Sequence, residues 1–97
     1  MGKSTIVTGW VIYVTNAESE APGFADAVTR VNRGLKPLSV APHRLISAMR
    51  SIRPRAIVLD SRLKRDLPGV MLAVARHASG AAILTDRDLS HLERVLR

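Results

Sequence analysis

Short apolar runs alternate along the chain with longer segments in which apolar residues recur every three or four positions. The runs occupy 10–16, 36–41, 56–60 and 81–85, and each has the length of a β-strand. Their nearly continuous apolarity indicates strands that are covered on both faces, as in a parallel sheet. Pro37 lies near the start of the second run and predicts an edge strand, because proline cannot donate a ladder hydrogen bond.

The segments between and after these runs predict amphipathic helices. In the first, Phe24, Val28 and Val31 fall on one helical face. Pro54 predicts the end of the second helix, and Gly80 the end of the third. The four expected helical segments are 17–34, 42–54, 68–79 and 88–97.

A strand followed by a helix, four times over, predicts right-handed β-α-β units with a parallel sheet between helical layers. The expected fold is an α/β/α three-layer sandwich with a four-stranded, mainly parallel sheet. With 97 residues, we expect a single domain over 10–97. Residues 1–9 are interpreted as a leader or a short extra strand.

The amino-acid composition excludes several kinds of functional site. The absence of cysteine excludes disulfides, thiolate metal sites and thiol nucleophiles. No apolar run approaches the ~20 residues of a membrane span, and the first residues do not resemble a secretory signal. We therefore expect a cytoplasmic protein without a membrane partner. The formal net charge of +7 favours acidic partners, either an acidic protein surface or nucleic acid.

The middle of the chain resembles the receiver domains of response regulators, which have the flavodoxin-like fold. The string GLKPLSVAPHRLISAMRSIRPRAIVLDS carries the resemblance, together with LPG at 67–69 and ILTDRD at 83–88. It covers about residues 10–92 and implies the strand order 2-1-3-4. It also implies that Asp60 matches the phosphoacceptor and Thr85 the switch hydroxyl.

The chain departs from the receiver pattern at three places. Thr15 and Asn16 stand where receivers have the paired acids that hold magnesium, and neutral oxygens alone are poor magnesium ligands. The basic segment 61–66 is longer than the usual link, and the chain ends before a fifth strand. We therefore expect a degenerate, shortened receiver-like domain without a metal or cofactor.

Asp60 has two interpretations from its position at a strand end. It could face the crevice in which α/β folds bind ligands. Alternatively, it caps the following turn through a local hydrogen bond. No nucleophile elbow or triad accompanies it, and we do not expect an enzyme.

Two surfaces are candidates for partner binding. If the order 2-1-3-4 holds, the last strand is an exposed apolar edge that could pair with a second copy or another protein through Ile83 and Leu84. That edge could instead be covered by the last helix. A basic cluster could contact phosphates or an acidic protein face, or simply be solvated. Its members are Arg50, Arg53, Arg55, Arg62, Lys64 and Arg65.

The sequence thus leads to three functional hypotheses. The first is a non-catalytic regulatory or interaction module that docks on an acidic protein surface, or on itself as a homodimer. The second is a nucleic-acid-associated protein that binds phosphates through the basic loop. The third keeps Asp60 as a true phosphoacceptor.

Overall fold

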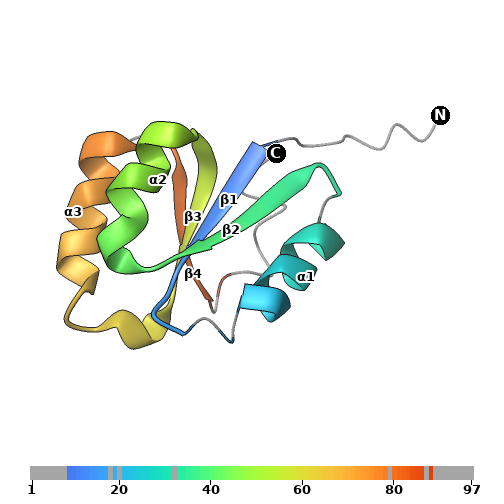
Figure 1. Ribbon diagram of the computed structural model, residues 1–97, viewed down its shortest axis with the longest axis horizontal. Coiled ribbons are helices and arrows are strands. Elements are labelled where there is room, and N and C mark those ends of the chain that lie inside the picture. Colours follow the sequence, from blue (N-terminus) through green and yellow to red (C-terminus); the bar gives the residue numbers. More distant parts are fainter. Residues whose placement is uncertain are drawn as a thin grey trace.

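The computed structural model describes residues 9–17, 19, 21–31, 33–78, 80–86 and 88. The expected leader at 1–9 and the expected last helix at 88–97 lie outside this part of the chain, apart from Gly9 and Asp88. The described elements alternate between strands and helices (Figure 1). They are β1 (Gly9–Val14), α1 (Ala21–Val31), β2 (Leu35–Val40), the short 3-10 helix η2 (Pro42–Arg44), α2 (Leu45–Ser51), β3 (Pro54–Leu59), the 3-10 helix η3 (Ser61–Leu63), α3 (Leu67–His77) and β4 (Ala82–Thr85).

The four strands form one sheet in the order β2-β1-β3-β4, and every pairing is parallel. This confirms the strand order and the parallel sheet expected from the sequence. β2 is an edge strand, and Pro37 lies within it opposite Val11. The prediction of an edge position for this proline is therefore confirmed.

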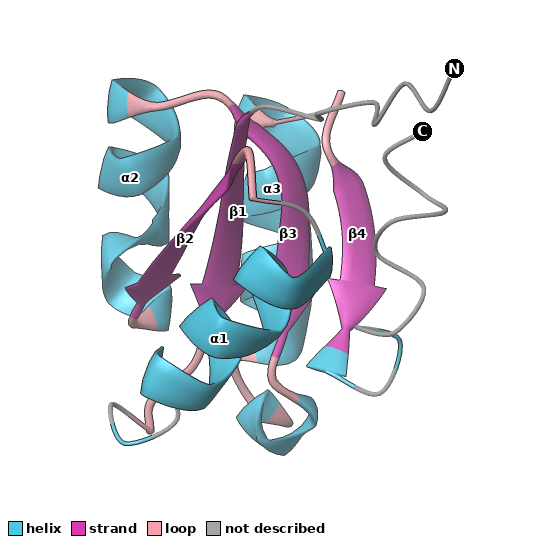
Figure 2. Cartoon of the chain, turned by 90° about the vertical axis from the view of Figure 1, so that its right-hand side faces the viewer, coloured by secondary structure: helices cyan, strands magenta, loops and turns pink. Residues whose placement is uncertain are grey.

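The helices cover both faces of the sheet. α1 lies on one face, whereas α2 and α3 lie side by side on the other (Figure 2). The helices run opposite to the strands, as short β-α-β crossovers require. The described structure is a three-layer α/β/α sandwich, which is compatible with a flavodoxin-like fold.

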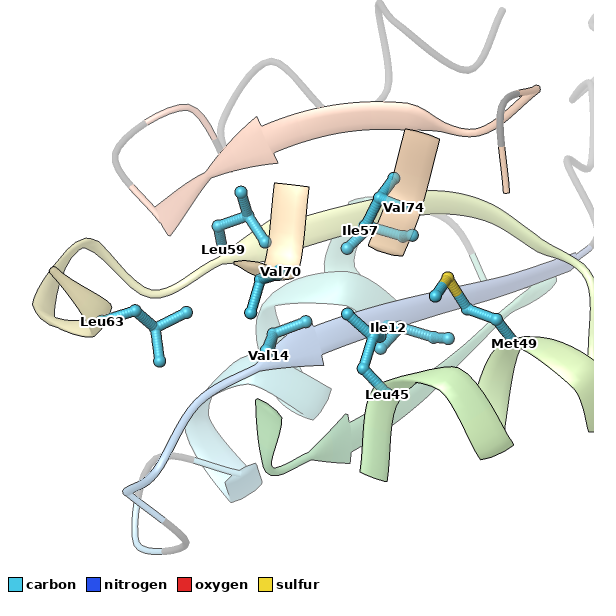
Figure 3. Packing of buried hydrophobic residues seen from close by; sticks show 9 residues of the cluster. All are labelled: Ile12, Val14, Leu45, Met49, Ile57, Leu59, Leu63, Val70 and Val74. Atoms are coloured by element: carbon cyan, nitrogen blue, oxygen red, sulfur yellow. The ribbon is translucent and has the colours of Figure 1, made fainter. Parts of the chain in front are cut away.

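Alternate residues of the central strands build two separate cores, because successive strand side chains point to opposite faces. On the α1 side, the ring of Tyr13 stacks on Phe24 with centroids 4.7 Å apart. On the α2–α3 side, Ile12 and Ile57 pack against the two helices (Figure 3). Apart from the aromatic pair and Met49, the buried core residues are aliphatic, as the composition predicts. Each fully buried Ile or Leu contributes roughly 1.5–3 kcal/mol to stability.

The second helix differs from the sequence-based expectation of one helix over 42–54. The segment begins with the 3-10 turn η2, continues as α2 and ends at Ser51. Ile52 is already extended, with φ −134° and ψ 154°, and Pro54 is the first residue of β3. The physical reason is that a proline disfavours helical geometry in the residue before it, so the helix ends before Pro54.

The amino end of the sheet contains an irregularity that involves Gly9 and Arg55. The register between β1 and β3 shifts after Trp10, which pairs with Pro54, whereas Val11 pairs with Ala56. Arg55 is thus the extra residue of a bulge. Its side chain crosses Gly9 so closely that a Cβ there would lie 2.5 Å from Arg55 Cδ. Gly9 also has φ +139°, which L side chains rarely adopt.

Candidate functional site

Asp60 follows the last residue of β3 at the carboxyl end of the sheet. Its side chain points to the α1 side, since Leu59 before it points to the α2–α3 side. Only 1% of Asp60 is exposed, and Thr15 at the end of β1 is buried beside it. The fold has therefore brought together two polar residues that are 45 positions apart in the sequence.

Among the described residues, Thr15 and Arg62 donate hydrogen bonds to the Asp60 carboxylate. The Thr15 hydroxyl donates to Oδ2 over 2.6 Å. The Arg62 backbone N–H donates to Oδ1 over 2.9 Å, which closes the turn at η3. The Arg62 guanidinium donates from Nε to Oδ1 over 3.0 Å and from Nη2 to Oδ2 over 2.9 Å. Asp60 thus caps the turn, as one of its two interpretations proposed.

These donors keep the Asp60 carboxylate ionised. The pKa of Asp60 is lowered from 3.8 to about 2, chiefly by the hydrogen bond from the Arg62 side chain, and the bonds from the Thr15 hydroxyl and the Arg62 backbone add to it. Together they outweigh burial, which raises the pKa. Burial raises the pKa of Tyr13 nearby, and the negative charge of Asp60 adds to this shift. Donors thus engage both oxygens of the Asp60 carboxylate. This arrangement suits a structural ion pair.

Thr85, the residue that resembles the switch hydroxyl, lies at the end of β4 and is exposed. Its hydroxyl donates to Asp88 Oδ2 over 3.0 Å. A second carboxylate, Asp86, accepts a hydrogen bond of 3.2 Å from the Ser61 hydroxyl and so links β4 to the turn after β3. The Thr85 hydroxyl is therefore directed to its own loop.

The six residues of the expected basic cluster divide between two ends of the molecule. Arg50, Arg53 and Arg55 lie at the amino end of β3, whereas Arg62, Lys64 and Arg65 follow its carboxyl end. β3 has six residues and spans roughly 20 Å from end to end, at about 3.3 Å per residue. The six side chains do not form one patch.

The basic loop at 61–66 is less free than the sequence suggested. Leu63 is 4% exposed and anchors the loop in the core on the α2–α3 side. Arg62 turns back to Asp60. Arg62, Lys64 and Arg65 are all exposed, but of these three only the Arg62 side chain is bound to Asp60 in the described part of the chain. Lys64 has φ +28°, an uncommon value for a residue with a side chain.

A cleft of about 620 Å³ opens at the carboxyl ends of β1 and β2, a feature that the sequence-based analysis missed. Its polar lining comes from Thr15, Asn16 and Ser39 and from His43 and Arg44 of η2. The rule that ligands bind outside the carboxyl ends of parallel strands was applied to Asp60 after β3, but it applies equally to the ends of β1 and β2. Thr15 lines the cleft and also bonds to Asp60.

The expected interface residues of the edge strand have different environments. Ile83 is 44% exposed, and its register partner Ile57 places it on the α2–α3 side. Leu84 is partly buried against the core on the α1 side. In the part of the chain that the structure describes, β4 pairs with β3 only.

The described residues contain no group of three or more His, Asp or Glu side chains that could hold a metal ion. None of the described helices has the length and apolarity needed to span a membrane. Comparison with protein-family models, with curated proteins and with solved structures found no significant match to this chain.

Proposed function

We propose that the protein is a non-catalytic interaction module that docks on an acidic surface of another protein. The docking surface, called the α2–α3 face below, consists of the exposed side chains on the α2–α3 side of the sheet, from these two helices and from β4 at the sheet edge. The observation that supports it is the placement of the large hydrophobic side chains that are exposed among the described residues. Ile46, Met71, Leu72 and Ile83 are 41–54% exposed, and all belong to this side of the sheet.

The α2–α3 face combines exposed apolar residues with basic residues that are close to them in the sequence, and protein interfaces contain both kinds of residue. Leu72 and Met71 are adjacent in α3. Exposed basic residues flank them, with Lys64 and Arg65 before the helix and Arg76 one turn after Leu72. The α1 side has no large exposed hydrophobic residue among those described.

The charge of the chain favours an acidic partner over a second copy. Two copies that each carry a formal net charge of +7 repel one another, whereas an acidic surface is attracted. Glutamate or aspartate residues of the partner could pair with Lys64, Arg65 and Arg76 while its apolar side chains contact Leu72. The homodimer thus becomes an alternative outcome of the experiment below.

The geometry around Asp60 supports a role without phosphoryl transfer. Asp60 is buried and already holds a positive partner in Arg62. The strand order agrees with the one that the receiver resemblance implies. One α/β fold can serve many functions. We therefore propose a receiver-like scaffold that binds a partner protein. In it, the Asp60–Arg62 ion pair occupies the position of the phosphorylation site and has a structural role.

The proposal is tested with a synthetic amphipathic helical peptide that has leucine on one face and glutamate on the other. We expect binding that weakens about tenfold in the double variant Met71→Ser/Leu72→Ser, because a few central apolar residues dominate such interfaces. Fluorescence anisotropy of the labelled peptide measures the affinity. Thr29→Ser, at an exposed position of α1, is the control and should leave the affinity for the peptide unchanged.

A second peptide with serine in place of leucine and the same charge shows whether apolar contact matters. Equal affinity for both peptides, or no effect of the double variant, would contradict the proposal. Light scattering gives the mass of the free protein. If the free protein is a dimer that dissociates in the double variant, the α2–α3 face binds a second copy of the chain and not an acidic partner.

A further inference from the structure

The direction of the strands and helices gathers cations at one end of the sheet. Because the helices run opposite to the strands, the amino ends of the strands and the carboxyl ends of α1 and α2 lie at the same end (Figure 2, top). Five of the exposed basic residues at this end make up what we call the amino-end face. They are Arg33 before β2, Lys36 in β2, Arg50 in the last turn of α2, and Arg53 and Arg55 around the start of β3. Arg30 and Arg76, in the last turns of α1 and α3, are not counted in it.

The described acidic residues have the opposite distribution. Asp60, Asp66, Asp86 and Asp88 all follow strands or precede α3, and so lie at the carboxyl end of the sheet. Asp26, in the middle of α1, pairs with Arg30 over 3.0 Å. Among the described residues, the positive charge of the amino-end face therefore has no comparable number of carboxylates beside it.

Trp10 adds an aromatic ring to the amino-end face. It lies opposite Lys36 in the β1–β2 ladder, and the Lys36 Nζ is 5.6 Å from the centre of its ring. Trp10 is partly exposed and is the one tryptophan of the chain. An aromatic ring beside several cations is the combination that single-stranded nucleic acids bind, since bases stack on the ring while the cations contact phosphates.

We propose that the amino-end face binds single-stranded nucleic acid without sequence preference. Arg33, Arg50 and Arg53 would contact phosphates, to which guanidinium groups can donate two hydrogen bonds at once. Trp10 would stack on an unpaired base, with Lys36 moving from the ring to a phosphate. A duplex offers no free base face to the ring, and a lipid or an acidic peptide offers no base. This surface differs from the α2–α3 face and from the basic loop at 61–66.

Titration of the whole chain with a single-stranded oligothymidylate tests the proposal. Because Trp10 is the one tryptophan, its fluorescence reports on this face directly. We expect quenching on binding. If about four phosphates are neutralised, affinity should fall about fiftyfold between 50 and 200 mM salt. Unchanged fluorescence, or an affinity that does not depend on salt, would overturn the proposal.

Two double variants with the same loss of charge locate the site. Arg50→Ser/Arg53→Ser should lower the affinity for the oligonucleotide about tenfold and reduce the salt slope by about 1.4. Lys64→Ser/Arg65→Ser removes two charges at the opposite end and should change the affinity less than about twofold. If the two double variants lower the affinity equally, the oligonucleotide is attracted by net charge alone. If Lys64→Ser/Arg65→Ser lowers it more, the binding site is the loop at 61–66. Either result would overturn the assignment, and circular dichroism verifies that each variant is folded.

The aromatic contact has its own test. Trp10→Leu keeps an apolar side chain at the position and should weaken binding of a labelled oligothymidylate about tenfold by anisotropy, through loss of stacking. Polyglutamate and anionic lipid vesicles of matched charge should bind more weakly than the oligonucleotide and without sensitivity to Trp10. Binding of either probe as tightly as the oligonucleotide would overturn the choice of nucleic acid. The variant Met71→Ser/Leu72→Ser should retain oligonucleotide binding, which separates this test from that of the proposed function.

Discussion

Charged residues have opposite environments at the two ends of the sheet. At the carboxyl end, Asp60 is buried and bonded to Thr15 and Arg62. At the amino end, Arg53 and Lys36 are exposed to solvent among further cations. Desolvation explains the difference, because a buried charge is costly unless it is paired and hydrogen-bonded, whereas an exposed charge is stabilised by water. The buried, paired charge of Asp60 therefore acts on stability, whereas exposed charges such as Arg53 and Lys36 can act on binding.

The largest effect is expected when the interactions of Asp60 at the carboxyl end are removed. Asp60→Ala should lower the free energy of unfolding by about 3 kcal/mol, since it leaves the buried Thr15 hydroxyl without its acceptor and removes the cap of the turn. Urea denaturation measures this. Asp26→Ala is the matched control, because Asp26 also pairs with an arginine but is 63% exposed. Its expected cost is below about 0.5 kcal/mol, and equal costs would contradict a structural role for Asp60.

A somewhat smaller effect should appear in acid. The pKa of Asp60 is lowered from 3.8 to about 2 in the folded protein. A lowered pKa means that the stabilisation is present above the unfolded value of 3.8 and is lost as the pH falls through about 2. It amounts to about 2 kcal/mol. Urea denaturation from about pH 2 to pH 6 should show this loss in the natural protein but not in Asp60→Asn. Parallel profiles for the two proteins would show that the ion pair does not stabilise the fold.

The smallest effect concerns the backbone at the amino end. Gly9→Ala should destabilise by about 1 kcal/mol, because φ is +139° and the new Cβ would press on the movable side chain of Arg55. Gly23→Ala in α1 meets nothing within 4 Å and should instead stabilise slightly. Thermal unfolding of both variants measures the contrast. Effects of the same sign would mean that the conformation of Gly9 is not required.

The alternation of apolar strands and amphipathic helices made the described fold predictable. The four runs became β1 to β4 with small shifts of their ends, and the prediction of Pro37 in an edge strand was confirmed. The second helix does end before Pro54 as predicted, but it ends at Ser51 and its first turn is 3-10, so a single α-helix does not fill the expected segment. Periodicity identifies which segments are buried, whereas capping and proline geometry decide where each element ends.

The candidate sites were less predictable, because they depend on contacts between distant segments. Asp60 was recognised as a residue at a strand end, but its partner Thr15 belongs to another strand. Arg62 was assigned to a solvent-facing cluster, although its side chain reaches back to Asp60. Proximity in the sequence grouped Arg53 with Lys64, and the length of β3 separates them.

The sequence by itself determined the class of fold, the aliphatic nature of the two cores and the excess of positive charge, because these follow from residue types and their spacing along the chain. The tertiary structure alone decided which charges are neutralised and which side of the sheet presents exposed Leu72 and Ile83. The physical reason is that pairing and burial depend on which residues become neighbours in space, and the parallel crossovers bring together segments that are far apart in the chain.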